Sequence, residues 1–359
     1  MTSGREARQL SFLPLQTKTK FSFSGKHPLE HQGCERAGHA DRPSCPAGPG
    51  RSQAGPARSC RAPLEHAPRR TWHLADRTVA RAMPRIGRAM LCRSMAGAQA
   101  GRMPSTFVEL KTGDGAMKTE IVTQEGEGPW PAVILCFDAG GPRRVMTEMA
   151  ERISRGGYLV VIPDLYHRVG AIVDLLPAGA PKEPTQIIPQ LANKDVLQKF
   201  LTTFYASATD YDHLKIDIGS VLEYLANRPD VKGGIGTTGY CMGGNISLRI
   251  ATLFGDRIAA TAAFHAGGIA VPQPDSPHLR VGAIRSKVYI AGAIEDGWFT
   301  DDMKQTLEKA LAEAGVDHVV ETYPARHGFA VADNPTYDAA QSDRHFQALE
   351  KLYANLSGR

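Results

Sequence analysis

The stretch Gly239-Tyr240-Cys241-Met242-Gly243 decides the fold. It stands between an apolar, strand-like run over 231–239 and an apolar, helix-like run over 246–254, which is the arrangement of a nucleophile elbow with Cys in place of Ser. The glycines have a steric role, because a Cβ two residues before or after the nucleophile would collide with its neighbours. The cysteine would be strained and would lie at a helix N-terminus, where the backbone dipole favours a thiolate. A buried Cys in a Gly-rich turn of another α/β protein is the alternative.

Two further candidate residues follow the elbow in the chain order nucleophile, acid, base that elbow enzymes use. Asp296, with Glu295 beside it, comes after a short apolar run over 287–292, and His327 comes after another run over 319–323. Open α/β sheets carry their sites just past the carboxyl ends of the strands. Asp296 alone could cap a helix and His327 alone could be a surface histidine, but three matches in order favour one shared site.

Apolar runs alternate with helical patterns through residues 103–359. We expect strands over 118–123, 132–137, 159–162, 235–238, 259–264, 287–290 and 319–323, and helices over 146–155, 194–225, 245–253, 303–314 and 337–356. The polar, Pro-containing stretch 167–193 is expected to be a long loop or cap. This alternation predicts an α/β fold with a mostly parallel, doubly wound sheet flanked by helices.

The first 102 residues differ in composition from the rest. They hold 18 Lys and Arg against 6 Asp and Glu, a net charge of +12, whereas the whole chain is +5 and residues 103–359 are therefore −7. Their Pro, Gly and Arg content and the lack of a long apolar period predict a disordered leader. It is either a gene-model extension upstream of Met103 or a transit segment. The basic charge gives no reason to expect nucleic-acid binding by the domain over 103–359.

The cysteines and apolar runs limit the function further. Of six cysteines only Cys136 and Cys241 fall in the expected domain, and Cys136 lies in the apolar run 132–137, which indicates a core residue. No metal-ligand spacing is present, so we expect no metal and no cofactor. No stretch is apolar enough to span a membrane. One functional thiol indicates a reducing compartment, and we expect a cytoplasmic monomer or homodimer.

The motifs around the candidate residues resemble the dienelactone hydrolase family of α/β-hydrolases. They are Gly-Tyr-Cys-Met-Gly-Gly around Cys241, the acid Asp296, His-Gly-Phe from His327 and Pro-Asp-Leu-Tyr at 163–166. The resemblance runs from about residue 106 to the C-terminus and implies a single α/β-hydrolase domain. It implies a carboxylic ester hydrolase that cleaves a small ester or lactone through an acyl-cysteine intermediate. Cys241 would be the nucleophile, His327 the base and Asp296 the acid that orients it, with Glu295 as the alternative acid.

The elbow and the loop after the strand 132–137 would supply the oxyanion hole. One donor is the N–H of Met242, and Ala139 in the Gly-rich loop is the preferred second donor. The resemblance also implies a modulating acid at Asp138, because a Glu at this place in the family interacts with the resting thiol. Asp138 is one methylene shorter than that Glu. An ordinary turn and a solvated Asp are the alternatives for these two loop residues.

The resemblance does not include the residue that binds the substrate's carboxylate in the founding enzyme of the family. The founding enzyme has an Arg shortly after its His-x-Phe that binds the dienelactone carboxylate, whereas this chain has Val331. Another cation could serve, but the three candidates are interpreted as solvated surface residues: Arg143, Arg144 and Arg168.

The substrate pocket is expected to contain three aromatic residues, namely Tyr166, Trp298 and Phe299. Core packing is the alternative for the last two. A thioesterase or peptidase on the same fold stays open as a rival function. So does a non-catalytic binding protein on a hydrolase scaffold, because fold alone does not imply activity.

Overall fold

The computed structural model describes residues 103–180 and 182–357. The expected leader over 1–102 lies outside these residues. The described part contains a sheet of eight strands. The strands are β1 (Ser105–Thr112), β2 (Gly115–Val122), β3 (Trp130–Cys136), β4 (Leu159–Pro163), β5 (Val231–Tyr240), β6 (Ala260–Phe264), β7 (Lys287–Ala293) and β8 (His318–Tyr323).

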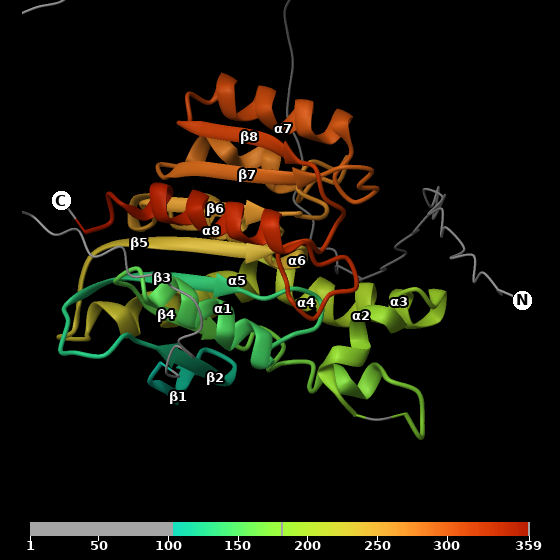
Figure 1. The fold of residues 1–359 in the computed structure, drawn as a ribbon, viewed down its shortest axis with the longest axis horizontal. Helices are drawn as coiled ribbons and strands as arrows, with labels where there is room; N and C mark the ends of the chain where they lie inside the picture. Colours follow the sequence, from blue (N-terminus) through green and yellow to red (C-terminus); the bar gives the residue numbers. More distant parts are fainter. Residues whose placement is uncertain (1–102, 181, 358–359) are drawn as a thin grey trace, which may run out of the picture. The chain divides into compact units, whose positions relative to one another are not determined.

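The strands lie in the order β1-β2-β4-β3-β5-β6-β7-β8 (Figure 1). β2 runs antiparallel to both β1 and β4. Every other neighbouring pair is parallel. The predicted mostly parallel sheet is therefore confirmed. Since parallel strands end at the same edge, the segments that follow β3, β5, β7 and β8 meet there.

Helices cover both faces of the sheet. α1 and α8 pack against β4 and β6 on one face and contact each other, and α6 packs against β5 and β6 on the other face together with α5. α7 joins α6 in a second cluster of buried side chains. The bounds are α1 (Arg144–Ser154), α5 (Tyr211–Ala226), α6 (Met242–Leu253), α7 (Asp301–Glu313) and α8 (Ala339–Tyr353).

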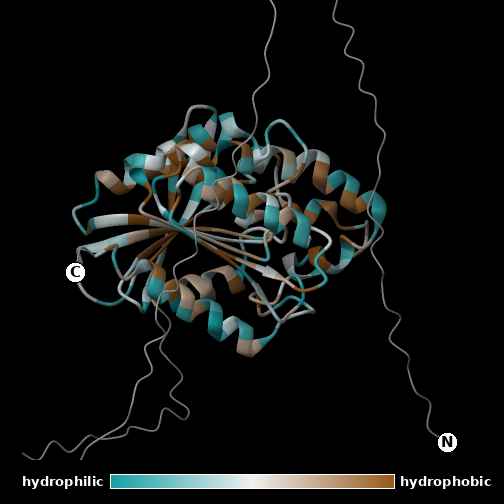
Figure 2. Cartoon of the chain, turned by 90° about the horizontal axis from the view of Figure 1, so that it is seen from above, coloured by the Kyte–Doolittle hydropathy of each residue, from teal (hydrophilic) through white to brown (hydrophobic). Residues whose placement is uncertain are grey.

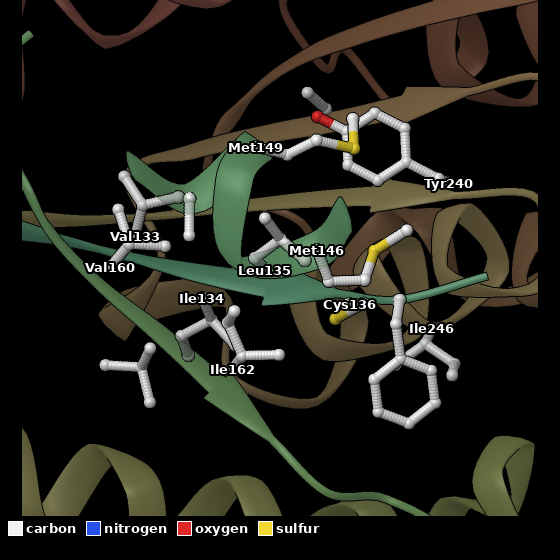
Figure 3. Close-up of a cluster of buried hydrophobic side chains, with 14 of the residues drawn as sticks. Val133, Ile134, Leu135, Cys136, Met146, Met149, Val160, Ile162, Tyr240 and Ile246 are labelled. Atoms are coloured by element: carbon white, nitrogen blue, oxygen red, sulfur yellow. The ribbon is translucent and has the colours of Figure 1, made fainter. Parts of the chain in front are cut away.

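The core lies on both sides of the central strands. Hydrophobic residues follow the strands and the inner faces of the helices, and hydrophilic residues lie on the outer helix faces (Figure 2). All seven residues of β3 are buried, as a central parallel strand requires. Figure 3 shows Cys136 as part of a cluster of buried side chains that also contains Leu135, Met146 and Ile246. The interpretation of Cys136 as a core residue is confirmed, since it is 0% exposed.

One expectation about the elements was wrong, and another lacked a detail. No strand was expected over Ser105–Thr112, yet β1 forms there as an edge strand along β2. The expectation that 194–225 is mostly helical is confirmed, although the helical stretch is divided into α3 (Lys194–Phe200), a π-helical turn (Leu201–Tyr205), α4 (Ala206–Thr209) and α5. The break has a local cause. Asp210 has extended backbone angles, and its side chain accepts hydrogen bonds from the N–H groups of Asp212 and His213, which starts a new helix.

The expected cap is also visible. The stretch 167–193 contains only short helical segments, including α2 (Ile187–Gln190), and α2, α3 and α4 lie beyond the ends of the strands in Figure 1. Among the described residues, none of the helices is both long and apolar enough to cross a membrane. No group of three His, Cys, Asp or Glu side chains in 103–180 and 182–357 is arranged to hold a metal ion.

Candidate active site

Cys241 forms a strained turn between β5 and α6. Its backbone angles are φ 54° and ψ −117°, which lie outside the regions that L-residues usually occupy. A Cβ on Gly239 would lie 1.9 Å from the carbonyl oxygen of Gly243, and a Cβ on Gly243 would lie 2.1 Å from that of Cys136. Real Cβ atoms do not approach backbone so closely, so the predicted steric role of both glycines is confirmed.

Hydrogen bonds to the end of β6 and to the segment that follows it hold the elbow in place. The N–H of Cys241 donates to the carbonyl oxygen of Phe264 (3.1 Å), and the N–H of Gly267 donates to that of Cys241 (3.3 Å). Asn245, in the first turn of α6, donates through Nδ2 to the carbonyl oxygens of Gly267 and Gly268. Sequence reasoning missed Asn245; a polar residue at an otherwise apolar position of the elbow helix is the only signal for it.

Asp296 and His327 are brought together as expected. Nδ1 of His327 lies 2.9 Å from Oδ2 of Asp296, and the other carboxylate oxygen accepts the N–H of Trp298 at 2.9 Å. The Asp296 side chain is fully buried. Glu295 points elsewhere, since its side chain is 68% exposed and pairs with Arg326. Of the two neighbouring acids, only Asp296 contacts the histidine.

The histidine also reaches the thiol. A hydrogen bond joins the side chains of His327 and Cys241. Burial disfavours a charged imidazole, but the charge of Cys241 and the hydrogen bonds to Asp296 and Cys241 outweigh it and raise the pKa of His327 to about 10. The raised pKa favours a protonated His327 at neutral pH, and its ring interacts with both Asp296 and Cys241.

The loop after β8 holds His327 in place through its backbone. The Oγ1 of Thr336 donates to the carbonyl oxygen of His327 and to Oδ1 of Asn334. Gly328 has φ +96°, and a Cβ there would lie 2.5 Å from the Asn334 side chain. A glycine is therefore required directly after the histidine.

The two expected oxyanion donors are free. The N–H groups of Met242 and Ala139 donate to no other residue within the described ranges. The Ala139 carbonyl oxygen accepts from the hydroxyl of Tyr166 at 3.2 Å, and the same hydroxyl lies 3.7 Å from Sδ of Met242. Tyr166 is 2% exposed, so it supports the loop and the elbow from the interior.

Asp138 is engaged by an arginine. Its two carboxylate oxygens accept from Nη1 and Nη2 of Arg143 at 2.6 and 2.9 Å, and Oδ1 also accepts the N–H of Gly140. The interpretation of Arg143 as a solvated residue was wrong, because its side chain is 4% exposed. Arg168 was also misread, since it is 11% exposed and pairs with Asp114 and Asp217.

Two of the aromatic residues proposed for the pocket differ in exposure. Trp298 is 44% exposed, whereas Phe299 is fully buried in the second hydrophobic cluster. Phe299 therefore offers no surface to a substrate in this structure, and the alternative of core packing applies to it.

Two aromatic residues near the thiol were missed. Tyr205, at the end of the π-helical turn, accepts from Nδ2 of Asn245 at 3.3 Å. Burial, and to a lesser extent the charge of Cys241, raise the pKa of Tyr205 to about 12. His265 is fully buried, and its ring meets that of His327 edge-on at 5.1 Å. Both depend on long-range packing, so the local sequence carries no signal for them.

A cavity of about 400 Å³ lies beside the oxyanion loop. Arg143 and Tyr166 form part of its wall together with Met146, Ile162 and Ile172. Cys241 and His327 do not line it. The candidate site is therefore the set of groups around the thiol, and the cavity is a separate feature behind the loop.

A search of family models matches residues 117–357 to the dienelactone hydrolase family. A carboxymethylenebutenolidase 1 from Cupriavidus pinatubonensis is 23% identical over 251 residues, which cover 70% of this chain and 97% of the relative. A carboxymethylenebutenolidase from Pseudomonas sp. strain P51 is 22% identical over 226 residues, 63% of this chain and 85% of the relative.

Solved structures share the fold. A dienelactone hydrolase-like promiscuous phosphotriesterase from metagenomic libraries is 22% identical and has a TM-score of 0.55; the match covers 71% of this chain and 99% of that one. Because the family model spans most of the described residues, the chain belongs to the dienelactone hydrolase family and is a carboxylic ester hydrolase with the α/β-hydrolase fold.

Proposed function

We propose that the chain hydrolyses a small, uncharged ester or lactone with Cys241 as nucleophile, His327 as base and Asp296 as the orienting acid. The observation that carries the proposal is the position of His327. Nδ1 of its ring is hydrogen-bonded to Asp296, and its side chain is also hydrogen-bonded to Cys241. This is the nucleophile–base–orienter order that covalent catalysis requires.

The first step forms an acyl-cysteine. The Cys241 thiolate attacks the carbonyl carbon, and the carbonyl electron pair moves to the oxygen. The N–H groups of Met242 and Ala139 stabilise that oxyanion, each by about 10²- to 10³-fold in rate. When the intermediate collapses, the C–O bond breaks and His327 gives its proton to the leaving alkoxide. A lactone opens without releasing a separate alcohol.

The second step hydrolyses the thioester. Neutral His327 takes a proton from water, and the resulting hydroxide attacks the acyl carbon. The C–S bond then breaks, the acid is released and Cys241 leaves as a thiolate beside the imidazolium. Asp296 accepts a hydrogen bond from His327 throughout and stabilises the charged ring.

Charge around the site supports an uncharged substrate. Val331, where the founding enzyme has its carboxylate-binding Arg, is fully buried. Arg143 and Arg168 are each shared between two carboxylates, and Arg144 pairs with Glu148 on the surface. A carboxylate on the substrate would have to displace an existing ion pair, which costs free energy.

We also propose which residues form the catalytic unit, in which compartment it works and its oligomeric state. We take residues 103–359 as the catalytic unit and the first 102 residues as dispensable for hydrolysis. A free nucleophilic thiol needs a reducing compartment, for which the cytoplasm is our proposal. The active unit is a monomer or a homodimer.

A hydrolysis screen over small esters, lactones, thioesters and peptides tests this function, with Cys241→Ala as the control. We expect ester or lactone cleavage that Cys241→Ala abolishes, and little discrimination in favour of acyl groups with a carboxylate. Rapid quenching followed by peptide mass mapping is expected to find the acyl group on Cys241. Preferred cleavage of thioesters or peptides would transfer the assignment to those classes, and no cleavage at all would favour the scaffold reading.

A further inference from the structure

Arg143 uses all of its hydrogen-bonding capacity within the protein. A guanidinium has five N–H groups. Nη1 donates to Asp138 at 2.6 Å and to the Gly141 carbonyl oxygen at 3.2 Å, Nη2 donates to Asp138 and Asp333 at 2.9 and 2.8 Å, and Nε donates to Asp333 at 2.7 Å. None of these donors is left for a substrate.

The two carboxylates belong to different loops of the site. Asp138 follows β3 and begins the loop that contains Ala139, a proposed oxyanion donor. Asp333 lies six residues after His327, on the loop that carries the base, and 190 residues from Arg143. Two-pronged pairs with a guanidinium fix orientation as well as distance. Arg143 therefore fastens the oxyanion loop to the histidine loop.

The same network sets the orientation of the peptide groups around Ala139. Asp138 accepts the N–H of Gly140 at 2.9 Å, and the Tyr166 hydroxyl donates to the carbonyl oxygen of Ala139. These bonds hold the peptide groups on the C-terminal side of Ala139 in a fixed orientation. The Ala139 N–H, which has no acceptor within the described residues, is left for the substrate.

The arginine is charged under all ordinary conditions. Burial disfavours its charge, but Asp138 and the hydrogen bonds to Asp333 outweigh burial and hold the pKa of Arg143 well above its usual value. A buried pair broken on one side leaves an uncompensated charge, which costs several kcal/mol. Movement of either loop is therefore opposed by the other.

We propose that Arg143 is a positioning residue: it keeps the Ala139 N–H aimed at the oxyanion by tying the Asp138 carboxylate to Asp333 on the histidine loop. The inference rests on the proposed function, because it assumes that an oxyanion forms at Cys241. Arg143 itself does not touch the substrate. Its loss is expected to affect the step in which negative charge develops on the carbonyl oxygen, and little else.

Two reactions of the same thiol distinguish this role from a general structural one. Ester hydrolysis develops an oxyanion, whereas alkylation of Cys241 by iodoacetamide does not. For Arg143→Ala we expect kcat to fall about 10²-fold, the effect of losing one oxyanion donor. KM and the alkylation rate are expected to stay within about threefold of the parent, because ground-state binding and the thiol are unchanged.

Arg168 provides a matched control. It too is largely buried and forms two-pronged pairs with two aspartates, Asp114 and Asp217, but it has no bond to the oxyanion loop. Arg168→Ala is expected to lower the melting temperature as Arg143→Ala does, while kcat stays within about threefold. Arg143→Lys keeps the charge but not the two forks, so it is expected to resemble Arg143→Ala.

Rescue and a milder variant complete the test in the full-length enzyme. Free guanidinium, far below concentrations that unfold proteins, is expected to restore part of kcat in Arg143→Ala and none in Cys241→Ala. Should Arg143→Ala fail to fold, Asp333→Asn at the more exposed end of the network is expected to lower kcat about tenfold with KM unchanged.

Three outcomes count against the inference. A folded Arg143→Ala with parental kcat overturns it, and so does a rise in KM with kcat unchanged, which would indicate direct substrate binding. Equal losses of kcat and alkylation rate in Arg143→Ala and Arg168→Ala would show a structural role only. A parent enzyme without Cys241-dependent hydrolysis overturns the proposed function first, and this inference with it.

Discussion

The two cysteines of the described chain stand at the ends of neighbouring strands, Cys136 as the last residue of β3 and Cys241 directly after β5, but in opposite environments. Cys136 ends β3 and is in register with Gly239 of β5, two residues before Cys241. Cys136 has no exposed surface, and burial raises the pKa of its thiol well above the usual value. Cys241 lies in the turn that follows β5, is partly exposed and is hydrogen-bonded to His327.

The difference teaches that backbone geometry and one partner, not the residue type, give the two thiols their different environments. The strand keeps Cys136 inside the sheet, whereas the positive φ of Cys241 directs its sulfur out of the turn. Of the two described thiols, that of Cys241 is the one that contacts the imidazole of His327. Each test below removes or exchanges one element of this contrast.

Removal of the Cys241 thiol, compared with removal of the Cys136 thiol, has the largest expected effect. Cys241→Ala removes the nucleophile, so we expect kcat for ester hydrolysis to fall by at least about 10⁴-fold. Cys136→Ala leaves a small core void, so we expect a stability loss of about 1 kcal/mol with kcat within about threefold. Steady-state kinetics and urea unfolding measure both. Substantial hydrolysis by folded Cys241→Ala would remove the functional distinction between the cysteines.

The acid that orients His327 comes next. Asp296→Asn loses the negative partner of the imidazolium, and we expect kcat to fall by about 10³- to 10⁴-fold with little change in fold. Glu295→Gln, whose parent side chain faces solvent and Arg326, is expected to stay within several-fold of the parent. Kinetics and circular dichroism check both variants. The reverse ranking would assign the orienting role to Glu295, and parental rates in both would refute a triad.

Thiol labelling sharpens the comparison without mutation. During brief treatment with iodoacetamide we expect Cys241 to react about 10²-fold faster than Cys136, because only the partly exposed thiol has a charged partner. Peptide mass mapping gives the ratio. Preferential modification of Cys136 in native protein would show that its burial does not protect it.

A smaller effect is expected in the pH dependence of stability. The pKa of His327 is raised from 6.5 to about 10, so the folded state binds this proton more tightly than the unfolded state. Its stabilising contribution is fully present below pH 6.5 and is lost as the pH rises through 10. The difference in melting temperature between the parent and His327→Gln is therefore expected to be largest near pH 6 and to shrink toward pH 10. A gap that widens with pH would contradict the ion pair.

The smallest expected effect comes from removing residues 1–102. The contact of His327 with Asp296 and the buried cluster around Cys136, as described above, are formed by residues of 103–357. A version of the chain that begins at Met103 is expected to keep the parent's kcat within about twofold and its melting temperature within about 2 °C. Differential scanning calorimetry and kinetics test it. A clear loss in either would show that the leader contributes to the enzyme.

Sequence reasoning succeeded where the chemistry is local. The Gly-x-Cys-x-Gly pattern predicted the elbow, because its glycines are dictated by contacts within a few residues. The continuous apolar run over 132–137 predicted a central strand and the burial of Cys136 for the same reason. Asp296 and His327 were predicted from their order in the chain, because parallel strands end at the same edge of the sheet and the residues that follow them meet there.

The failures at Arg143 and Phe299 have a common cause in long-range packing. Arg143 looked like a surface cation, since nothing near it in the sequence announces Asp333 as a partner. Phe299 and Trp298 are adjacent in sequence, and only the tertiary fold places one in the core and the other at the surface. The break at Asp210 was missed because its capping side chain overrides a helical pattern that continues on both sides.

The clamp at Arg143 has a consequence for protein synthesis. One of its aspartates lies at the start of the described chain and the other near its end, and chains emerge from the ribosome with the N-terminal part first. The growing chain therefore carries the Cys241 thiol before β8, His327 and Asp333 exist to complete it. Under the proposed mechanism, hydrolysis therefore requires translation to continue at least to Asp333, and a chain released before that residue is not expected to cleave esters.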